Sequence, residues 1–283
     1  QFTGDSRVTN SASFTAASGA TVRFAGGSHA MEEGARFLGE GYHELTDGTF
    51  SVNASVSAQR FRMSGGTLTG AGTFTSTGTF EWTGGTMSGQ GKTVIPSGSV
   101  LLFSSGNTKY ISQRTIDNSG ITTWSNGNIR GENGAVFNNL AGGVFDIRSD
   151  AYFYRQNNVN PIFNNAGTVQ KGTATGTTTF DYVTFNNTGG VAVNSGMIQF
   201  TGDSRVTNSA SFSAASGATL RFAGGSHSLQ EGTQFLGEGW HELTDGTISV
   251  NALVSAQNFR ISGGTLTGAG TLTVSGSLSW SGG

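Results

Sequence analysis

The sequence predicts an all-β protein, a single-stranded parallel β-helix (β-solenoid) with coils of about 19–26 residues. Three observations predict this fold: a short internal repeat, alternation of apolar and polar residues within short segments, and a composition of 46 Gly, two Pro and no Cys. Gly at this level without a collagen period indicates many short strands joined by tight turns. Connections between parallel strands are right-handed as a rule, so we expect a right-handed coil.

The short repeat occurs in two families. Ser64–Gly72 reads Ser-Gly-Gly-Thr-Leu-Thr-Gly-Ala-Gly, and the same pattern returns 19 residues later as Thr83–Gly91. The second family is an apolar residue, any residue and Asn, with successive spacings of 21, 26, 22 and 21 residues between Asn118, Asn139, Asn165, Asn187 and Asn208. A unit this short cannot bury an apolar face alone, so such units stack into a solenoid.

Alternation within the repeats predicts which side chains face the interior. In segments such as Gly78–Trp82 and Gly190–Val193 every second residue is apolar, and these residues point inward because side chains alternate across a strand. Gly-Gly, Asn-Gly and Ser-Gly pairs mark the corners. Only Met31–Arg36 has a composition that permits a helical turn. We expect one continuous interior lined by Phe74, Phe80, Phe137, Phe145, Phe163, Phe185 and Phe200.

A larger repeat of 198 residues contains the short one. Residues 1–85 return, about three-quarters identical, as residues 199–283. We therefore divide the chain into one full solenoid unit, residues 1–198, and the start of the next copy, residues 199–283, continuous with the first. At ~4.8 Å per coil the unit is about 45 Å long, and we expect the two copies to superpose with a displacement along one axis. We also expect the native chain to continue beyond both ends, and exposed coil ends to associate end to end.

Composition excludes several classes of function. Only 11% of the residues are charged and the net charge is −2, so nothing favours binding to nucleic acid. No apolar run approaches the ~20 residues of a membrane span, so we expect no membrane insertion. The absence of Cys excludes a disulfide or a thiolate-metal centre and is compatible with a secreted bacterial protein.

The recurring Asn residues are candidates for either a binding site or a structural ladder. Repetition in every coil is what stacking requires and what a single ligand site does not. We interpret Asn118, Asn139, Asn165, Asn187 and Asn208 as a structural ladder at a corner, in which each side-chain amide bonds the coils above and below and tolerates a left-handed backbone.

The segment His43–Asp47, repeated as His241–Asp245, gathers one His and two carboxylates and resembles a divalent metal site. Alternation argues against it, because His43 and Glu44 point to opposite faces of a strand. With Leu45 in the core, Glu44 is predicted to be solvated, and Asp47 is predicted to bond its own backbone in a turn. We predict no metal, no cofactor and no catalytic residues.

The segment Arg148–Gln156 is the most distinctive candidate for recognition. It lies in the longest coil, and alternation places Tyr152 and Tyr154 outward while Phe153 points inward. Exposed Tyr flanked by Arg148 and Arg155 is typical of contact surfaces for a partner chain or a glycan. The alternative is a bulged loop that packs on its own solenoid. We expect Tyr152→Ala with Tyr154→Ala to weaken association and to leave folding intact.

The Phe-Asn-Asn-x-Gly-x-Val and Gly-Gly-Thr-Leu-Thr-Gly-x-Gly-Thr motifs resemble those of large repetitive extracellular β-solenoid proteins of bacteria, of the filamentous haemagglutinin and autotransporter-passenger kind. The resemblance implies a structural, non-enzymatic segment of a long secreted or cell-surface fibre or adhesin, with end-to-end or lateral self-association and a glycan or cell-surface ligand. The alternative is a carbohydrate-binding or carbohydrate-cleaving β-helix. An ice-binding solenoid fits less well, because the Thr-x-Thr pairs are concentrated in the Gly-rich coils and are not kept through the Phe-Asn-Asn family.

Overall fold

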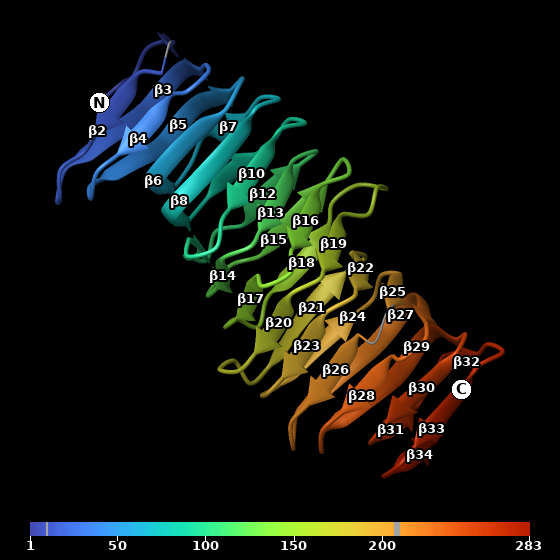
Figure 1. Ribbon diagram of the computed structural model, residues 1–283. Helices are drawn as coiled ribbons and strands as arrows, with labels where there is room; N and C mark the ends of the chain where they lie inside the picture. The colour runs from blue at the N-terminus through green and yellow to red at the C-terminus, as the bar shows by residue number, and fades with distance from the viewer. Residues whose placement is uncertain (10, 207–209) are drawn as a thin grey trace.

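The chain forms one parallel β-solenoid of about 13 turns, as predicted. The computed structural model describes residues 1–9, 11–206 and 210–283, and these residues contain strands and turns but no helix. Figure 1 shows an elongated stack in which the first and last strands lie at opposite ends. Every strand pair is parallel, as a coil that advances by one strand spacing per turn requires.

Each turn contributes three strand segments, and like segments pair into three faces along the rod. Face 1 contains β1 (Ser6–Val8), β7 (Thr67–Thr69), β9 (Gly85–Met87), β12 (Lys109–Ser112), β15 (Ile129–Glu132), β18 (Tyr152–Arg155), β21 (Thr177–Asp181), β24 (Met197–Phe200), β31 (Phe259–Ile261) and β34 (Leu278–Trp280).

Face 2 contains β2 (Ser13–Thr15), β4 (Arg36–Leu38), β10 (Lys92–Ile95), β13 (Thr115–Asn118), β16 (Val136–Asn139), β19 (Ile162–Asn165), β22 (Thr184–Asn187), β25 (Ser204–Val206) and β32 (Thr265–Thr267). Face 3 contains β11 (Val100–Phe103), β14 (Ile121–Trp124), β17 (Val144–Ile147), β20 (Thr168–Lys171), β23 (Gly190–Val193), β26 (Ser211–Ala214), β28 (Gln234–Leu236), β30 (Leu253–Ala256) and β33 (Thr271–Val274).

Six longer strands bend through a corner and belong to two faces. They are β3 (Thr21–Met31), β5 (Tyr42–Val52), β6 (Val56–Met63), β8 (Thr73–Trp82), β27 (Thr219–Leu229) and β29 (Trp240–Val250). The expected turn around Asp47 is such a corner, because the pairing register shifts there without interrupting the strand. Gly48 has a φ of +77°, and a Cβ on it would lie 2.4 Å from the carbonyl oxygen of Gly27 in the coil below.

The interior is one continuous apolar core, and all seven Phe residues predicted to line it are buried. Rings from the three faces meet at the centre of the coil: Phe163 of face 2 lies 5.0 Å from Phe145 of face 3 and 5.5 Å from Phe180 of face 1. Along the rod, Phe163 stacks between Phe137 and Phe185 at 5.1 and 5.2 Å, close to the spacing of the coils.

The two copies have the same internal pairing. Thr21 pairs with Tyr42 in the first copy as Thr219 pairs with Trp240 in the second, and the register shifts at the corner coincide. They do not lie on the same faces, however. The first segment of β3 belongs to face 3, whereas the first segment of its counterpart β27 follows β24 on face 1.

This change of face follows from the number of strand segments in the repeat. In the described residues, twenty-four strands lead from β1 to its counterpart β25, and four of them, β3, β5, β6 and β8, supply two segments each. The repeat therefore has 28 segments, which is nine coils and one further strand. The expected displacement along the axis thus comes with a rotation by one face, because 28 is not a multiple of three.

We predict that Phe163→Ala destabilises the solenoid by about 3–5 kcal/mol, because it leaves a cavity between two stacked rings. Urea unfolding followed by far-UV circular dichroism measures this loss. Phe163→Leu is the matched control and is expected to cost less than about 1.5 kcal/mol, since it keeps most of the buried volume. Equal losses in the two variants would contradict a close-packed interior.

Candidate functional site

Strand β18 places the predicted Tyr pair on the outer surface of face 1. Tyr152 is 50% exposed and its neighbour Phe153 is buried, whereas Tyr154 is only partly exposed. Tyr154 lies in register between Arg130 of β15 and Asp181 of β21. The Tyr residues therefore belong to the sheet itself, and the long loop of this coil follows the strand at residues 156–161.

The two flanking Arg residues lie in different surroundings. The guanidinium of Arg155 stacks on the ring of Tyr182, 4.4 Å from its centre, and donates to Asn160 Oδ1 at 2.9 Å. Arg148 follows β17 on face 3 and pairs there with Asp146, with Nε 2.6 Å from Oδ2. The structure thus brings Arg155 and Tyr182 to the Tyr pair, and it places Arg148 on a different face.

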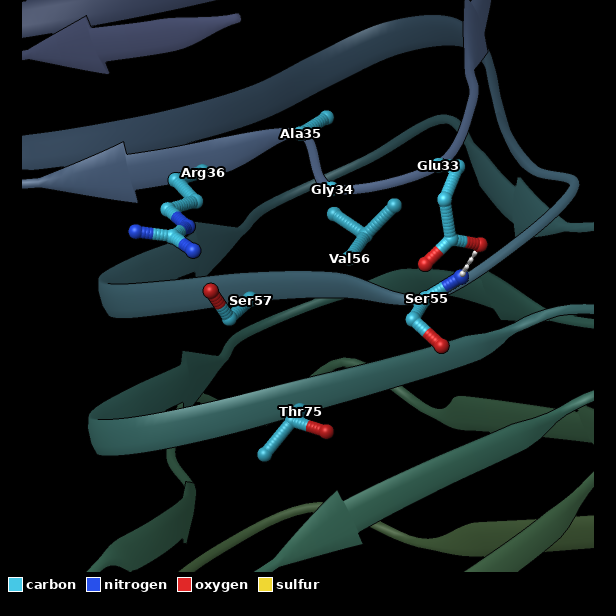
Figure 2. A pocket seen from close by; sticks show the side chains of 8 residues that line it. All are labelled: Glu33, Gly34, Ala35, Arg36, Ser55, Val56, Ser57 and Thr75. Atoms are coloured by element: carbon cyan, nitrogen blue, oxygen red, sulfur yellow. Dashed lines mark hydrogen bonds between the residues drawn. The ribbon is translucent and has the colours of Figure 1, made fainter. Parts of the chain in front are cut away.

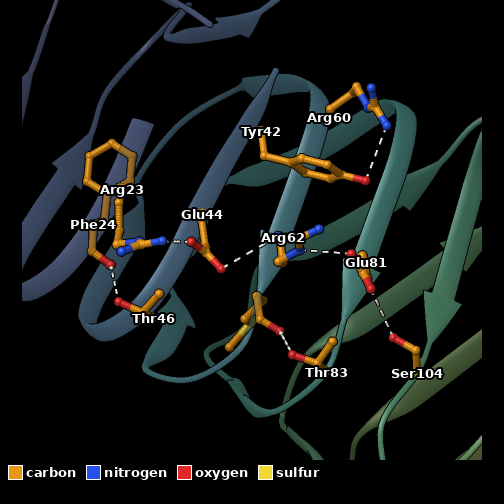
Figure 3. A network of polar contacts seen from close by, with 11 residues as sticks. Arg23, Phe24, Tyr42, Glu44, Thr46, Arg60, Arg62, Glu81, Thr83 and Ser104 are labelled. Carbon is orange, nitrogen blue, oxygen red and sulfur yellow. Dashed lines mark hydrogen bonds and ion pairs between the residues drawn. The ribbon is translucent and has the colours of Figure 1, made fainter. Parts of the chain in front are cut away.

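A charged ladder on face 3 of the first copy joins four successive coils (Figure 3). Glu44 accepts from Arg23 Nε at 2.9 Å, and Arg62 Nε donates to Glu81 at 2.8 Å. Arg62 also lies 3.9 Å from Glu44, which connects the two pairs. The guanidinium groups of Arg60 and Arg62 lie 4.6 and 4.1 Å from the centre of the Tyr42 ring.

The second copy repeats this ladder on face 1. Glu242 accepts from Arg221 Nε at 2.8 Å and lies 3.4 Å from Arg260 Nη1, while Arg260 stacks on Trp240 at 4.4 Å. Trp240 replaces Tyr42, so the stack of an aromatic ring with Arg is kept. Sequence reasoning missed the ladder because Arg23, Glu44 and Arg62 are far apart in the chain; their spacing by one coil was the available signal.

The burial of Glu44 corrects one prediction. Glu44 is buried beneath its two Arg partners and is not solvated. His43 and Glu44 point to opposite sides of the strand, as alternation predicts.

His43 points into the core, where its Nε2 lies 3.1 Å from the carbonyl oxygen of Phe14. Asp47 Oδ1 accepts from the backbone N–H of Gly48 at 2.7 Å, so Asp47 bonds its own backbone as predicted. In the described part of the chain, no three His, Asp or Glu residues lie close enough together to hold a metal ion.

An Asn ladder runs inside face 2, at the ends of β13, β16, β19 and β22. Asn118 Nδ2 donates to Asn139 Oδ1, Asn139 to Asn165, and Asn165 to Asn187, each at 2.8 Å, and all four side chains are buried. None of these four residues has the left-handed backbone that we expected. The remaining predicted member, Asn208, lies outside the described residues.

A second ladder runs beside it on the outside of face 2. Asn138 Nδ2 donates to Asp117 Oδ1 at 2.7 Å, Asn164 to Asn138 at 2.8 Å, and Asn186 to Asn164 at 2.9 Å. The Phe-Asn-Asn motif thus supplies three rows: an inward Phe, an outward Asn and an inward Asn at the end of the strand. Of the two Asn rows, only the inner one was predicted from the sequence.

Buried cations hold the loops of the middle coils. Lys109 Nζ donates to the carbonyl oxygens of Ser105, Asn107 and Asn126 at 2.7–3.0 Å, and burial lowers the pKa of Lys109 to about 8. Arg114 is fully buried and donates to Thr93 Oγ1 at 2.8 Å, and burial lowers its pKa to about 10. Lys109 thus joins its own loop to the next coil, and Arg114 also binds the carbonyl oxygens of Ser88 and Lys92 in the preceding coil, so both groups have a structural role.

A shallow, open hollow of about 260 Å³ lies on face 2, lined by Glu33, Gly34, Ala35, Arg36, Ser55, Val56, Ser57 and Thr75. Figure 2 shows these side chains. Glu33 lies across the hollow from the backbone N–H of Ser55, at 3.5 Å. The second copy has a smaller counterpart of about 140 Å³ on face 3, where Leu253, 58% exposed, takes the place of Ser55. The hollow is therefore lined by a polar side chain in one copy and by an apolar one at the same position in the other. A site for one specific ligand would keep the same lining in both copies.

Comparison of the chain with models of protein families, with curated proteins and with solved structures finds no match. The described residues include no helix long and apolar enough to cross a membrane.

We predict that Asn139→Ala destabilises the solenoid by about 2–4 kcal/mol, because it removes one hydrogen bond from each of the buried amides of Asn118 and Asn165. Asn138→Ala is the matched control on the outer ladder and is expected to cost about 1 kcal/mol or less, since water reaches its partners. Urea unfolding of the two variants measures the difference. An equal loss of unfolding free energy in the two variants would mean that the inner ladder contributes no more to stability than the outer ladder.

We predict that stability falls as the pH drops from about 6.5 to about 4. Burial lowers the pKa of His227 and of His241 to about 4, from an ordinary value of 6.5, and it also lowers the pKa of His43. The fold therefore favours neutral His, and the unfolded chain takes up protons first as the pH falls. Urea unfolding at a series of pH values measures the loss, and His241→Phe should reduce its slope. A profile that is unchanged in this variant would contradict the assignment.

Proposed function

We propose that this chain is a structural, non-enzymatic module of a long extracellular or cell-surface fibre of the adhesin type, built from tandem 198-residue solenoid units. The observation that carries the proposal is the junction between the copies. It has the same construction as any turn within a copy, so tandem units of this kind extend one rod.

The junction is continuous in both backbone and core. Strand β24 spans the boundary, since Met197 and Ile198 end the first copy, and it pairs in register with β27 of the second; Thr219 N donates to the carbonyl oxygen of Gly196 at 3.0 Å. Phe200 stacks on Phe222 at 5.9 Å and lies 4.6 Å from Phe185. A rod made this way lengthens by about 45 Å per copy without a hinge.

The polar contacts also support a mechanical role. The charged ladder and both Asn ladders run along the rod, each linking a coil to the next. Contacts of this kind resist separation of the coils, because an axial load acts on all the interstrand hydrogen bonds and ladders of a turn together. They do not converge on one groove, as the carboxylates of a carbohydrate-cleaving enzyme do.

Self-association and a glycan or cell-surface ligand belong to the same proposal. Open coil ends supply unpaired strand edges for end-to-end contact. The exposed Tyr side chains of face 1 supply a surface for a glycan or cell-surface ligand. No nucleic acid partner is proposed, because the net charge is −2 and acidic and basic residues alternate along the ladders.

We predict that a protein of four tandem units, labelled through one introduced Cys per unit, shows labels about 45 Å apart along a single straight rod. Ser57→Cys and its equivalents suit this experiment because the chain has no Cys of its own and Ser57 is on the outer surface of face 2. Electron microscopy with a thiol-reactive gold label gives the spacing, and the labels should advance by one face per unit. A string of separate globular particles would exclude the fibre.

A further inference from the structure

We propose that each junction between copies creates a composite strip on one face of the rod, and that this strip binds a linear, uncharged polysaccharide. The proposal rests on the tandem fibre proposed above and adds a ligand class and a site. The strip is defined as the outer surface of face 1 from Tyr110 in β12 to Arg260 in β31. Its first half comes from the end of the first copy and its second half from the start of the second.

The two halves meet in one unbroken row of stacked side chains. Successive strand pairings place the following residues one above another on the outer side of face 1: Tyr152, Thr179, Gln199, Arg221, Glu242 and Arg260. Thr179 and Glu242 are covered by their neighbours, and the other four side chains form the accessible surface of the row. The copy boundary falls between Thr179 and Gln199, and Gln199 lies 3.5 Å from Arg221. We call the surface formed by Tyr152, Tyr154 and Tyr182 the Tyr surface. The Tyr surface of the first copy therefore continues along face 1 into the charged ladder of the second copy.

The extra strand of the repeat creates this continuity. In the first copy the equivalent ladder, Arg23 to Glu81, lies on face 3, one face away from the Tyr surface of the same copy. A repeat of 27 segments would keep the ladder of every copy on face 3 and the Tyr surface on face 1. With 28 segments, each ladder follows the Tyr surface of the preceding copy, and successive junctions occupy successive faces.

The charge of the strip favours an uncharged ligand. Four Arg residues face three carboxylates, and the Arg residues are already engaged: Arg130 with Glu132 at 2.9 Å, Arg221 and Arg260 with Glu242, and Arg155 on the ring of Tyr182. A polyanion would have to displace these carboxylates. The half-exposed rings of Tyr152 and Tyr182 instead offer apolar surface with a polar tip, which suits the alternating C–H and O–H groups of a sugar.

The dimensions favour a slender ligand. Eight strands at ~4.8 Å give a length of about 34 Å, and four residues of a strand give a width of about 13 Å. The resulting area of about 440 Å² is well below the ~800 Å² per partner of a standard protein interface. A second rod would gain little from this surface alone, whereas a polysaccharide chain laid along the axis covers it.

The test uses the 283-residue chain with cellohexaose, xylohexaose and maltohexaose as three uncharged linear probes, and titration calorimetry as the readout. At least one probe is expected to bind saturably. Tyr152→Ala with Tyr154→Ala in the first copy, and Trp240→Ala with Arg260→Ala in the second, should each weaken binding by about tenfold, the loss expected when one anchor of about 1.4 kcal/mol is removed.

The matched control is Tyr42→Ala with Arg62→Ala, which removes the same pair of groups from the ladder on face 3. It should change the affinity by less than about twofold, because no Tyr surface precedes that ladder in this chain, and circular dichroism checks the fold of all three variants. An equal loss in the control, or a loss in only one of the two face 1 variants, would overturn the composite strip.

Three further results would overturn the ligand assignment. They are the absence of saturable binding to all three hexasaccharides, tighter binding of a sulfated hexasaccharide, and side-by-side pairing of rods that the face 1 variants abolish in sedimentation. Each of these leaves the fibre intact if the labelled tandem protein still shows a straight rod. Separate globular particles in that experiment would remove the fibre and the strip together.

Discussion

The parallel hydrogen-bonded pairing of each coil with the next is the interaction on which the rest of the structure depends. It holds a residue directly beneath its counterpart one coil later, at a fixed spacing of ~4.8 Å. Every side chain therefore has two neighbours that the pairing imposes. The fold then requires that each row along the rod consist of groups that tolerate stacking, and the rows described above meet this requirement in different ways.

Inside the rod most rows are apolar and one contains a run of stacked amides, while single buried polar groups such as Thr93, Thr122 and Lys171 lie within otherwise apolar rows. Phe137, Phe163 and Phe185 stack nearly parallel, because flat rings fit the coil spacing. An Asn row works equally well in the same interior, because an amide has a donor and an acceptor on opposite sides and each one satisfies the next. Beneath Asn118 the row is continued by Ile95, and above Asn187 by Val206, so the amide row is bounded by apolar residues.

Outside the rod, stacking forbids rows of one charge and favours alternation. Glu44 lies between Arg23 and Arg62, and this arrangement allows a carboxylate to be almost fully covered by the sheet surface. Cations inside the rod find their partners at the corners: Lys109 and Arg114 donate to backbone carbonyl oxygens there, and Lys171 pairs with Asp150 at 2.6 Å. The number of strand segments per repeat determines which rows of one copy continue into which rows of the next copy.

The sequence by itself determined the solenoid class, the inward Phe positions and the outward direction of Tyr152, because these depend on periods of two and of about 21 residues. Only the tertiary structure decided which rows meet. The burial of Glu44, the outer Asn ladder and the separation of Arg148 from the Tyr pair all depend on coil lengths, which vary from 18 residues (His43 to Phe61) to 27 (Tyr152 to Thr179). The second copy is rotated by one face because long strands such as β3 and β8 bend through a corner and supply two segments each. The alternation of apolar and polar residues does not reveal such a corner, because the strand continues through it.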